Sequence, residues 1–163
     1  MQSSDGIGLA YQRYGPAVFR RARQILGTDA DAHEIVQDVF LSLFENPAQF
    51  QGKSALTTFL YSATTHACLN RVRNQNNRTR LLREQERQRA AETQTSLAPD
   101  QLVMLHQAMQ QMPDPLAEVA VYYLVDGLTQ QEISRLLSCS RRHVGDLLER
   151  LRAWGTAQET ASC

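Results

Sequence analysis

The sequence lacks the features that mark several large classes of protein. Its three cysteines, Cys68, Cys139 and Cys163, are odd in number and widely spaced, which argues against a disulfide framework and for a reducing compartment. No apolar run approaches the roughly 18 residues that a membrane-spanning helix needs, and the N-terminus has no hydrophobic stretch of the signal-peptide kind. We therefore expect a cytoplasmic protein with no membrane insertion.

Signatures of catalysis and of metal binding are also missing. The sequence contains no glycine-rich phosphate loop, no HExxH pair and no nucleophile elbow. Its four histidines fall on different predicted helices, and His66 and Cys68 stand without the spaced partners of a zinc site. We therefore expect no enzymatic activity, no metal and no cofactor.

Neither sign of charge is in excess. Lys and Arg number 17, as do Asp and Glu, so the formal net charge at pH 7 is +0. A nucleic-acid partner would therefore require a local basic surface. The segment 53–89 is a candidate for that surface, because its basic residues outnumber its only acidic ones, Glu84 and Glu86.

Hydrophobic periodicity predicts helices along most of the chain. Apolar residues recur at three-to-four spacing, and glycine, proline or a capping residue marks most boundaries. Helices are predicted over residues 9–26, from Asp29 or Asp31 to a stop at Asn46 and Pro47, onward from Ser54, over 100–112 and 116–125, and as a pair within 127–151. We expect an all-α chain in which three helices, a flexible linker and four further helices follow one another.

The same periodicity predicts which side chains are buried. In the first helix the apolar face holds Tyr14, Val18, Ala22 and Ile25, with Arg13, Arg20, Arg21 and Arg23 largely off it. Gly15 and Pro16 are expected to kink or restart this helix. The apolar face of the second helix comprises Ile35, Val36, Val39, Phe40, Leu43 and Phe44, and that of the third comprises Leu56, Phe59, Leu60, Ala63 and Ala67.

The polar faces of the second and third helices differ in chemistry. The second carries an acidic strip of Asp31, Glu34, Gln37, Asp38 and Glu45, which is either solubilising surface or a docking face for a basic partner. The pattern alone favours surface. The third presents Thr57, Thr58, Tyr61, Thr65, His66, Asn70, Arg71 and Arg73. Aromatic and polar side chains beside arginine suit single-stranded nucleic acid, although an ordinary amphipathic helix has a similar composition.

Residues 127–151 have the pattern of a helix-turn-helix. Thr129 and Glu132 form a T-x-x-E capping box at the start of the first helix, and Ser140 supplies the N-cap of the second. The second helix buries a stripe of Val144, Leu147, Leu148 and Leu151. In this motif the first turn of the second helix faces the major groove, so Arg141, Arg142 and His143 are candidates for DNA contact. An ordinary helical hairpin with a solvated face is the alternative.

Taken together, these stretches resemble the extracytoplasmic-function (ECF) sigma factors, a compact group within the bacterial sigma-70 family. The similar stretches are YQRYGPAVFRRARQILG, DADAHEIVQDVFLSLFENPAQFQGKSALTTFLYSATTHACLNRVR and MPDPLAEVAVYYLVDGLTQQEISRLLSCSRRHVGDLLERL. The combination D-A-x-E-x-V-Q-[DE]-x-F followed by F-x-G-x-S-x-x-[TS]-[FW]-L-Y is the specific part. The resemblance covers nearly the whole chain.

The resemblance implies an architecture and partners. Residues 1–75 would form a region 2-like domain, 76–99 a linker and 100–163 a region 4-like helix-turn-helix domain. Such a protein binds core RNA polymerase and promoter DNA, melts the minus-ten element and recognises the minus-thirty-five element. Most members of the family are also held inactive by an anti-sigma factor, so we expect such a partner here.

The resemblance also implies the site residues. Polymerase docking falls on Asp31, Glu34, Gln37 and Asp38. Binding of the minus-ten element falls on Phe50, Gln51, Gly52, Lys53 and Ser54, which match a base-capturing loop, and on Thr57, Thr58, Tyr61, His66, Asn70, Arg71 and Arg73. Binding of the minus-thirty-five element falls on Thr129, Gln130, Gln131, Arg141, Arg142, His143, Asp146 and Arg150.

The sequence departs from the family pattern within the second helix of the helix-turn-helix. Gly145, Asp146, Leu147 and Glu149 stand where members often have Lys, Ser, Arg and His, and Ser138 replaces the usual turn glycine. His66 replaces a frequent asparagine in the third helix. Two alternatives therefore stay open. Beside the sigma factor that the resemblance implies, these alternatives are a helix-turn-helix regulator that acts without polymerase and a polymerase-sequestering protein with weakened DNA binding.

Overall fold

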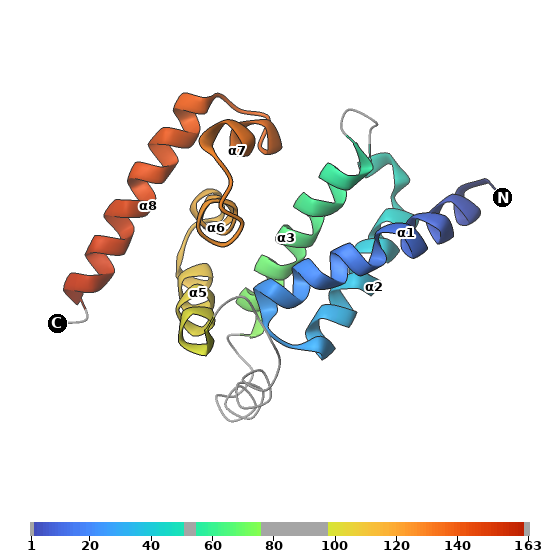
Figure 1. Ribbon diagram of the computed structural model, residues 1–163, viewed down its shortest axis with the longest axis horizontal. Helices are drawn as coiled ribbons and strands as arrows, with labels where there is room; N and C mark the ends of the chain where they lie inside the picture. The colour runs from blue at the N-terminus through green and yellow to red at the C-terminus, as the bar shows by residue number, and fades with distance from the viewer. Residues whose placement is uncertain (1, 51–54, 76–97, 162–163) are drawn as a thin grey trace. The chain divides into compact units, whose positions relative to one another are not determined.

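A computed structural model of the protein describes residues 2–50, 55–75 and 98–161. Within these ranges every regular element is a helix, which confirms the all-α prediction. Figure 1 shows the order of the helices along the chain. They fall into two compact units, residues 1–110 and 111–163. No helix in the described ranges is both long enough and apolar enough to span a bilayer.

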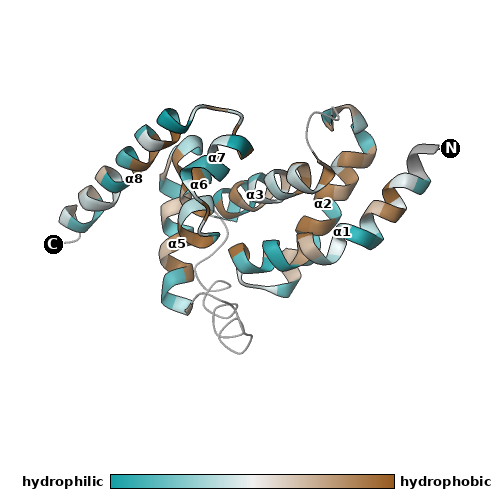
Figure 2. Cartoon of the chain, turned by 45° about the horizontal axis from the view of Figure 1, so that its top comes forward, coloured by the Kyte–Doolittle hydropathy of each residue, from teal (hydrophilic) through white to brown (hydrophobic). Residues whose placement is uncertain are grey.

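The first unit is built on three helices that pack on one another. They are α1 (Gln2–Leu26), α2 (Asp29–Glu45) and α3 (Leu56–Asn74), with a short 3-10 turn, η1 (Pro47–Gln49), between the last two. The core between them consists of Val18, Ala22, Ile25, Ile35, Val36, Val39, Phe40, Leu43, Leu60, Leu69 and Val72. Figure 2 shows hydrophobic stripes along these helices. Burial of these stripes supplies the main stabilising free energy of the unit.

Helix α1 runs through Pro16 as one element, so the helix does not restart at Gly15 and Pro16, where a kink or restart was expected. Pro16 is exposed, where water can bond the carbonyl that the proline ring deprives of a donor. Buried residues on either side of it, such as Ala10 and Val18, continue one apolar stripe. Packing of that stripe therefore outweighs the missing hydrogen bond.

Three other details of the first unit correct the predicted pattern. The N-cap of α2 is Thr28, whose hydroxyl oxygen accepts a bond of 3.3 Å from the Asp31 backbone N–H. Phe44 is 53% exposed and lies outside the core. Arg21 is buried, because its guanidinium donates to Thr65 Oγ1 and lies over the ring of Tyr61. An arginine can be buried where bonds and an aromatic face replace its water.

The buried face of α3 also differs from the prediction. It consists of Leu60, Thr64, Thr65, Cys68, Leu69 and Val72, while Leu56, Phe59, Ala63 and Ala67 are only partly covered. Thr64 and Thr65 can be buried because their hydroxyls donate to the carbonyls one turn back, at 2.6 and 3.0 Å. Burial raises the pKa of Cys68 to about 12, so its thiol stays protonated at neutral pH.

Helix α5 (Pro99–Gln111) packs on the first unit, although its sequence position places it at the start of the predicted second domain. Gly27 ends α1 with φ +87°, and a Cβ built there would lie 2.3 Å from Cδ2 of Leu102 in α5. Glycine is therefore required twice, for the left-handed backbone and for the approach of α5.

Replacing Gly27 by Ala is expected to lower the free energy of unfolding by about 1–2 kcal/mol, because alanine is strained at this φ and its methyl displaces Leu102. Chemical denaturation of the purified chain measures this. Gly15→Ala is the matched control, since a Cβ there meets no atom within 4 Å. Equal stability of Gly27→Ala and the wild type would contradict this account of the turn.

The second unit is a compact arrangement of short helices against one long one. Helix α6 (Asp114–Ala120) continues into a π-helical turn, η3 (Val121–Val125), and is followed by α7 (Gln130–Leu136) and α8 (Arg141–Ala161). Its core centres on the fully buried Tyr122, Ile133 and Val144, joined by Leu147 and Leu148. The predicted stripe of α8 is thus confirmed.

The turn between α7 and α8 contains Ser138 at φ 53°, a left-handed conformation that favours glycine. Replacing Ser138 by Gly is expected to raise the free energy of unfolding by about 1 kcal/mol, because glycine adopts this φ without strain. Ser138→Ala keeps the Cβ and should give no such gain. A Gly variant no more stable than the Ala variant in chemical denaturation would show that the turn stores no strain.

Candidate functional site

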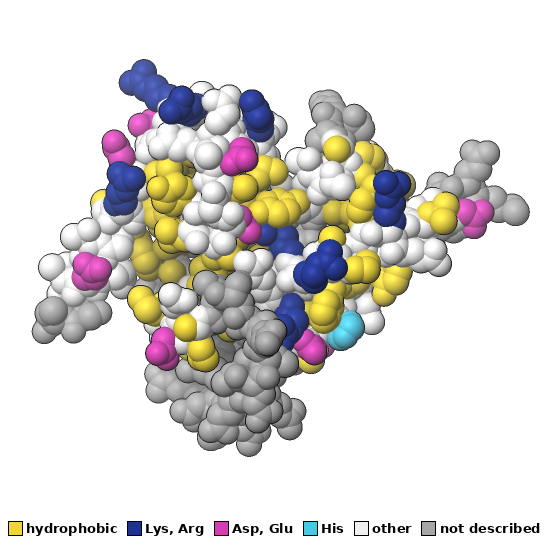
Figure 3. Space-filling model, in the orientation of Figure 1, with side chains coloured by type: hydrophobic (Ala, Val, Ile, Leu, Met, Phe, Trp, Pro, Cys, Tyr) yellow, Lys and Arg dark blue, Asp and Glu magenta, His cyan; other side chains and the backbone are white. Residues whose placement is uncertain are grey.

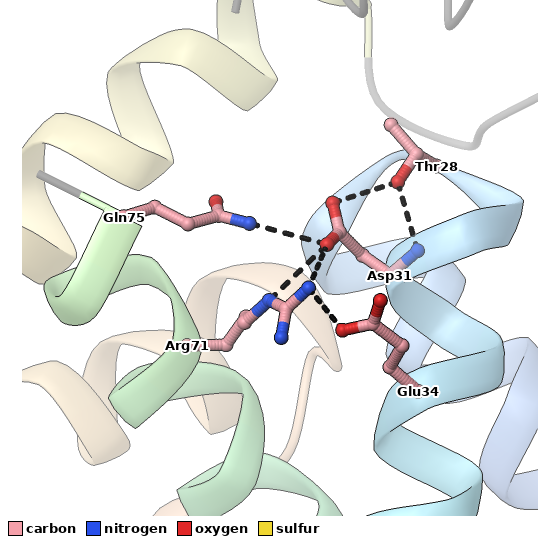
Figure 4. Close-up of polar contacts among 5 residues, drawn as sticks. All are labelled: Thr28, Asp31, Glu34, Arg71 and Gln75. Atoms are coloured by element: carbon pink, nitrogen blue, oxygen red, sulfur yellow. Dashed lines mark hydrogen bonds and ion pairs between the residues drawn. The ribbon is translucent and has the colours of Figure 1, made fainter. Parts of the chain in front are cut away.

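The predicted acidic strip of α2 divides into two parts, the first of which is tied to α3. Figure 4 shows Asp31, at the first turn of α2, facing Arg71 and Gln75 at the end of α3. Arg71 donates to Asp31 Oδ1 from Nη2 at 2.8 Å and from Nε at 3.2 Å, and Gln75 Nε2 donates to the same oxygen at 3.1 Å. The Thr28 hydroxyl donates to Oδ2 at 2.8 Å. Asp31 is therefore enclosed by donors.

Arg71 also pairs with Glu34, one turn further along α2. Partial burial would lower the pKa of Arg71, but its hydrogen bonds and charge interactions with Asp31 and Glu34 outweigh this and raise the pKa. The side chain of Asp31 is 11% exposed, whereas that of Glu34 is 55% exposed. Asp31 therefore stabilises the packing of α2 on α3, while Glu34 can still be reached from solvent.

The second part of the strip lies on an exposed face of α2. We call Gln37, Asp38, Leu41, Phe44 and Glu45 the docking face; all five are exposed and recur at three-to-four spacing. Leu41 is 55% exposed and Phe44 53%, so the face combines acidic and apolar chemistry. The sequence pattern did not single out Leu41, and it placed Phe44 on the apolar face of α2, where the structure leaves it exposed. Leu41 lies outside the apolar stripe of α2 in the helical repeat, and its exposure could have been predicted from that position.

The polar residues predicted on α3 do not form a single surface. His66 and Asn70 are exposed and lie one turn apart on one face. Tyr61 is half-buried and faces α1, with the guanidinium of Arg21 3.5 Å from its ring centroid. Thr57 is exposed and Thr58 half-buried in the first turn.

The two arginines predicted to bind the minus-ten element are both bonded to other helices. Arg71 reaches α2, as described above, and Arg73 donates from Nε to the Met109 carbonyl of α5 at 3.3 Å. Sequence periodicity placed both on a polar face but could not supply these partners, which lie 36 and 40 residues away. The two arginines therefore bond other helices, whereas His66 and Asn70 are exposed.

The predicted base-capturing loop is described only at its first residue. Phe50 follows η1 and contacts Phe59 of α3, with ring centroids 5.6 Å apart. Gln51, Gly52, Lys53 and Ser54 lie outside the described residues, as does most of the predicted linker. The aromatic contact anchors the entry to that segment against the first turns of α3.

The helix-turn-helix has the local geometry expected from its sequence. Thr129 Oγ1 accepts from the Glu132 backbone N–H at 3.2 Å, and the Glu132 carboxylate accepts from the Thr129 backbone N–H at 2.7 Å. This backbone bond, followed by the bond to the Thr129 hydroxyl, lowers the pKa of Glu132. Ser140 caps α8 by accepting from the His143 backbone N–H at 3.1 Å. Both predicted caps are confirmed.

The capped helix starts present the predicted DNA-contacting side chains. Arg141, Arg142 and His143 are exposed in the first turn of α8, and Asp146 and Arg150 are exposed further along it. Figure 3 shows basic side chains gathered where α7 meets α8. In α7, Gln131 is exposed and Gln130 half-buried, and the hydroxyl of Thr129 bonds Glu132. The motif can therefore offer guanidinium donors to a groove or to phosphates.

Metal-ligating side chains do not gather anywhere in the described ranges, where no three His, Cys, Asp or Glu residues could share an ion. Cys68 is buried among the helices of the first unit and Cys139 is partly exposed in the turn before α8.

Comparison with known proteins identifies the first unit. Residues 10–78 match the family model of sigma-70 region 2, a span that contains the docking face and α3. This part of the chain is similar to sigma-70 region 2. The resemblance expected from the sequence is thereby confirmed, and it includes the helix pair α2 and α3 that carries the network around Asp31. No curated protein matches the chain in sequence.

Among solved structures, the chain is similar to CnrH in a complex of CnrH with the cytosolic domain of CnrY. The match has a TM-score of 0.55 and 20% sequence identity, and it covers 99% of this chain and 95% of that chain. At this identity the likeness shows that the two chains share a helical fold.

Proposed function

We propose that the chain is an alternative sigma factor of the ECF group, which binds core RNA polymerase and directs promoter-specific initiation. The match of residues 10–78 to sigma-70 region 2 carries this proposal. In it, residues 1–75 form the polymerase- and minus-ten-binding domain, 76–99 a linker and 100–163 the minus-thirty-five-binding domain.

The docking face of α2 is the proposed polymerase contact. It offers the carboxylates of Asp38 and Glu45 beside the exposed side chains of Leu41 and Phe44. Interfaces of stable affinity combine an apolar centre with charged groups at the rim. Glu34 lies one turn before this face, so its carboxylate belongs to the rim. We assign Asp31 a supporting role, because it is buried under Arg71 and Gln75.

We choose the proposed DNA contacts from the predicted residues that are exposed in the structure. His66 and Asn70 are the proposed contacts of α3 with a melted minus-ten strand, with the segment from Phe50 to Ser54 capturing an unstacked base. Capture of a flipped base favours the melted duplex because it offsets the loss of stacking. Arg141 and Arg142 are the proposed contacts with the minus-thirty-five element.

Replacing Arg141 and Arg142 together by Ala is expected to weaken duplex binding by about tenfold at fixed salt, because two guanidinium contacts are lost. The slope of log K against log salt should fall in magnitude by up to about 1.8, at roughly 0.9 for each phosphate contact. Fluorescence anisotropy with a labelled duplex of randomised sequence measures both quantities.

Arg152→Ala is the matched control for that experiment, since Arg152 is an exposed arginine of α8 two turns beyond Val144. It should leave affinity and slope nearly unchanged. If the double variant binds as the wild type does, the two arginines do not contact DNA.

A protein inhibitor is also part of the proposal. The similar CnrH structure contains the cytosolic domain of CnrY. By analogy, we propose that an anti-sigma factor binds this chain and covers surfaces needed for initiation. Competition between such a partner and core polymerase for the labelled chain would test this.

A second candidate, a polymerase-sequestering protein, is favoured by one observation. Asp146 and Glu149 are exposed on α8 and add negative charge beyond Arg141 and Arg142, where the DNA backbone would lie. Such a protein would bind core polymerase but would start no transcripts. Helix-turn-helix regulation without polymerase is disfavoured by the match to region 2.

Binding to core RNA polymerase is the direct test of the proposed function. The full chain, labelled at its N-terminus, is titrated with purified bacterial core polymerase and followed by anisotropy and by co-elution on a sizing column. We expect a stoichiometric complex that an established sigma factor displaces in competition. No complex at micromolar concentrations of both proteins would overturn the assignment.

A further inference from the structure

Arg21 of α1 and Tyr61 of α3 form a stacked pair within the first unit. The central carbon of the Arg21 guanidinium lies 3.5 Å from the centroid of the Tyr61 ring. At this distance the cation is attracted to the electron-rich face of the ring, and the attraction is stronger where water is excluded. Arg21 is only 8% exposed, so water is largely excluded on the arginine side of the pair.

Thr65, one turn after Tyr61, fixes the guanidinium in this position. Its Oγ1 accepts from Arg21 Nε at 3.1 Å and from Arg21 Nη2 at 2.6 Å. The same hydroxyl donates to the Tyr61 carbonyl at 3.0 Å, and Thr65 is itself buried. Two bonds to one buried atom leave the guanidinium little freedom to rotate. The contact with this immobile group therefore restricts the Tyr61 ring to one orientation.

The ring is the more accessible member of the pair. Tyr61 is half-buried, whereas Arg21 is 8% exposed, so a ligand arriving from solvent meets the ring before the guanidinium. An aromatic ring that is already fixed can stack on an unpaired base without the loss of side-chain freedom that binding otherwise costs. The cation also draws the π electrons of the ring toward itself, which reduces their repulsion with the π electrons of a base.

We propose that Arg21 is a positioning residue of the minus-ten interface, which holds the Tyr61 ring as a stacking platform for an unpaired base of the melted strand. Arg21 acts through Tyr61 and does not itself touch DNA. The inference rests on the proposed function, since the platform serves the melted minus-ten strand. Stacking of this kind accepts any base, because every base has a π face.

Two labelled oligonucleotides separate stacking from charge. One is a single-stranded 12-mer of randomised sequence, and the other is a 12-mer in which an abasic site replaces every base. The full chain is titrated into each at fixed salt and followed by fluorescence anisotropy, and the ratio of the two affinities measures the preference for bases. A smaller folded fraction or a lost phosphate contact weakens both affinities by the same factor, so it leaves this ratio unchanged.

Replacing Arg21 by Met should lower the ratio by about fivefold, because methionine fills space but supplies neither a planar cation nor bonds to Thr65. Tyr61→Leu should lower it by about tenfold, since the ring itself is lost. Adding Arg21→Met to Tyr61→Leu should have no further effect on the ratio, because Arg21 acts only through the ring. Thr65→Val removes the hydroxyl that fixes Arg21, so it should lower the ratio in the same direction. It carries the test if Arg21→Met does not fold.

Arg20→Met is the matched control. Arg20 is the adjacent arginine of α1 and is exposed, so its replacement removes one positive charge without disturbing the stacked pair. Any change in affinity should then be the same for both oligonucleotides. If Arg21→Met also changes both affinities by one factor, or if Thr65→Val leaves the ratio unchanged, Arg21 has no positioning role.

Binding to core polymerase, measured in parallel, separates the platform from the proposed function. Arg21 and Tyr61 lie outside the docking face, so every variant should bind polymerase as the wild type does. If the wild type binds polymerase but shows no preference for bases, or if Tyr61→Leu keeps that preference, the platform is wrong while the sigma assignment stands. If the wild type does not bind polymerase, the proposed function fails, and with it the assignment of the platform to a promoter strand.

Discussion

Replacing Asp31 by Asn is expected to lower the free energy of unfolding by about 3 kcal/mol, although the sequence gives Asp31 the appearance of an exposed docking residue. In the structure its carboxylate is nearly enclosed and accepts bonds from Arg71, Gln75 and Thr28. An amide keeps the shape but loses the charge, and its NH₂ group faces donors. Removing one charge of a buried ion pair is costly, and Arg71 then keeps only its pair with the more exposed Glu34.

Asp38→Asn is the matched control, because Asp38 is exposed on the same helix, two turns beyond Asp31. Surface substitutions of this kind change stability by no more than about 0.5 kcal/mol. Chemical denaturation of both variants at neutral pH compares them directly. Similar stabilities for the two variants would mean that Asp31 is not a structural residue, and its assignment to the polymerase contact would regain support.

The second large effect is expected at the polymerase contact. Replacing Leu41 and Phe44 together by Ser should weaken binding to core polymerase by about a hundredfold, because apolar side chains at the centre of an interface each contribute more than 1 kcal/mol. Both side chains are more than half exposed in the free chain, so little stability is lost. Titration of core polymerase with labelled chain measures the change.

Leu9→Ser controls for general loss of apolar surface, since Leu9 is 67% exposed on α1 and outside the docking face. Its affinity for core polymerase should match that of the wild type. Asp38→Lys tests the charged part of the same face and should slow association most at low salt. Unchanged affinity in both the double variant and Asp38→Lys would place the polymerase contact on another surface.

The elements that the sequence predicts well are those held by local interactions. The capping box of Thr129 and Glu132 and the N-cap of Ser140 each join residues three apart, so their spacing alone specifies the geometry. The buried stripe of α8 follows from helical periodicity in the same way. The all-α fold was therefore accessible from the sequence, as was the helix-turn-helix.

Elements that depend on distant partners were not accessible. The sequence predicts that Arg21 is solvated and that Arg71 binds DNA. In the structure each donates a hydrogen bond to a residue at least 40 positions away. Thr64 and Thr65 are buried although their side chains are polar, because their hydroxyls donate to carbonyls of the helix backbone. The docking of α5 depends on the ends of two other helices. Periodicity describes one helix at a time and cannot show these contacts.

The most direct test of the sigma-factor assignment is transcription from promoter fragments by purified core polymerase, with and without the chain. The template is a library of fragments from the host genome, which includes the DNA upstream of this gene. The account predicts new transcripts that require the chain and start at positions sharing two upstream elements. A chain that binds core polymerase yet starts no transcript from any fragment would contradict it and favour sequestration.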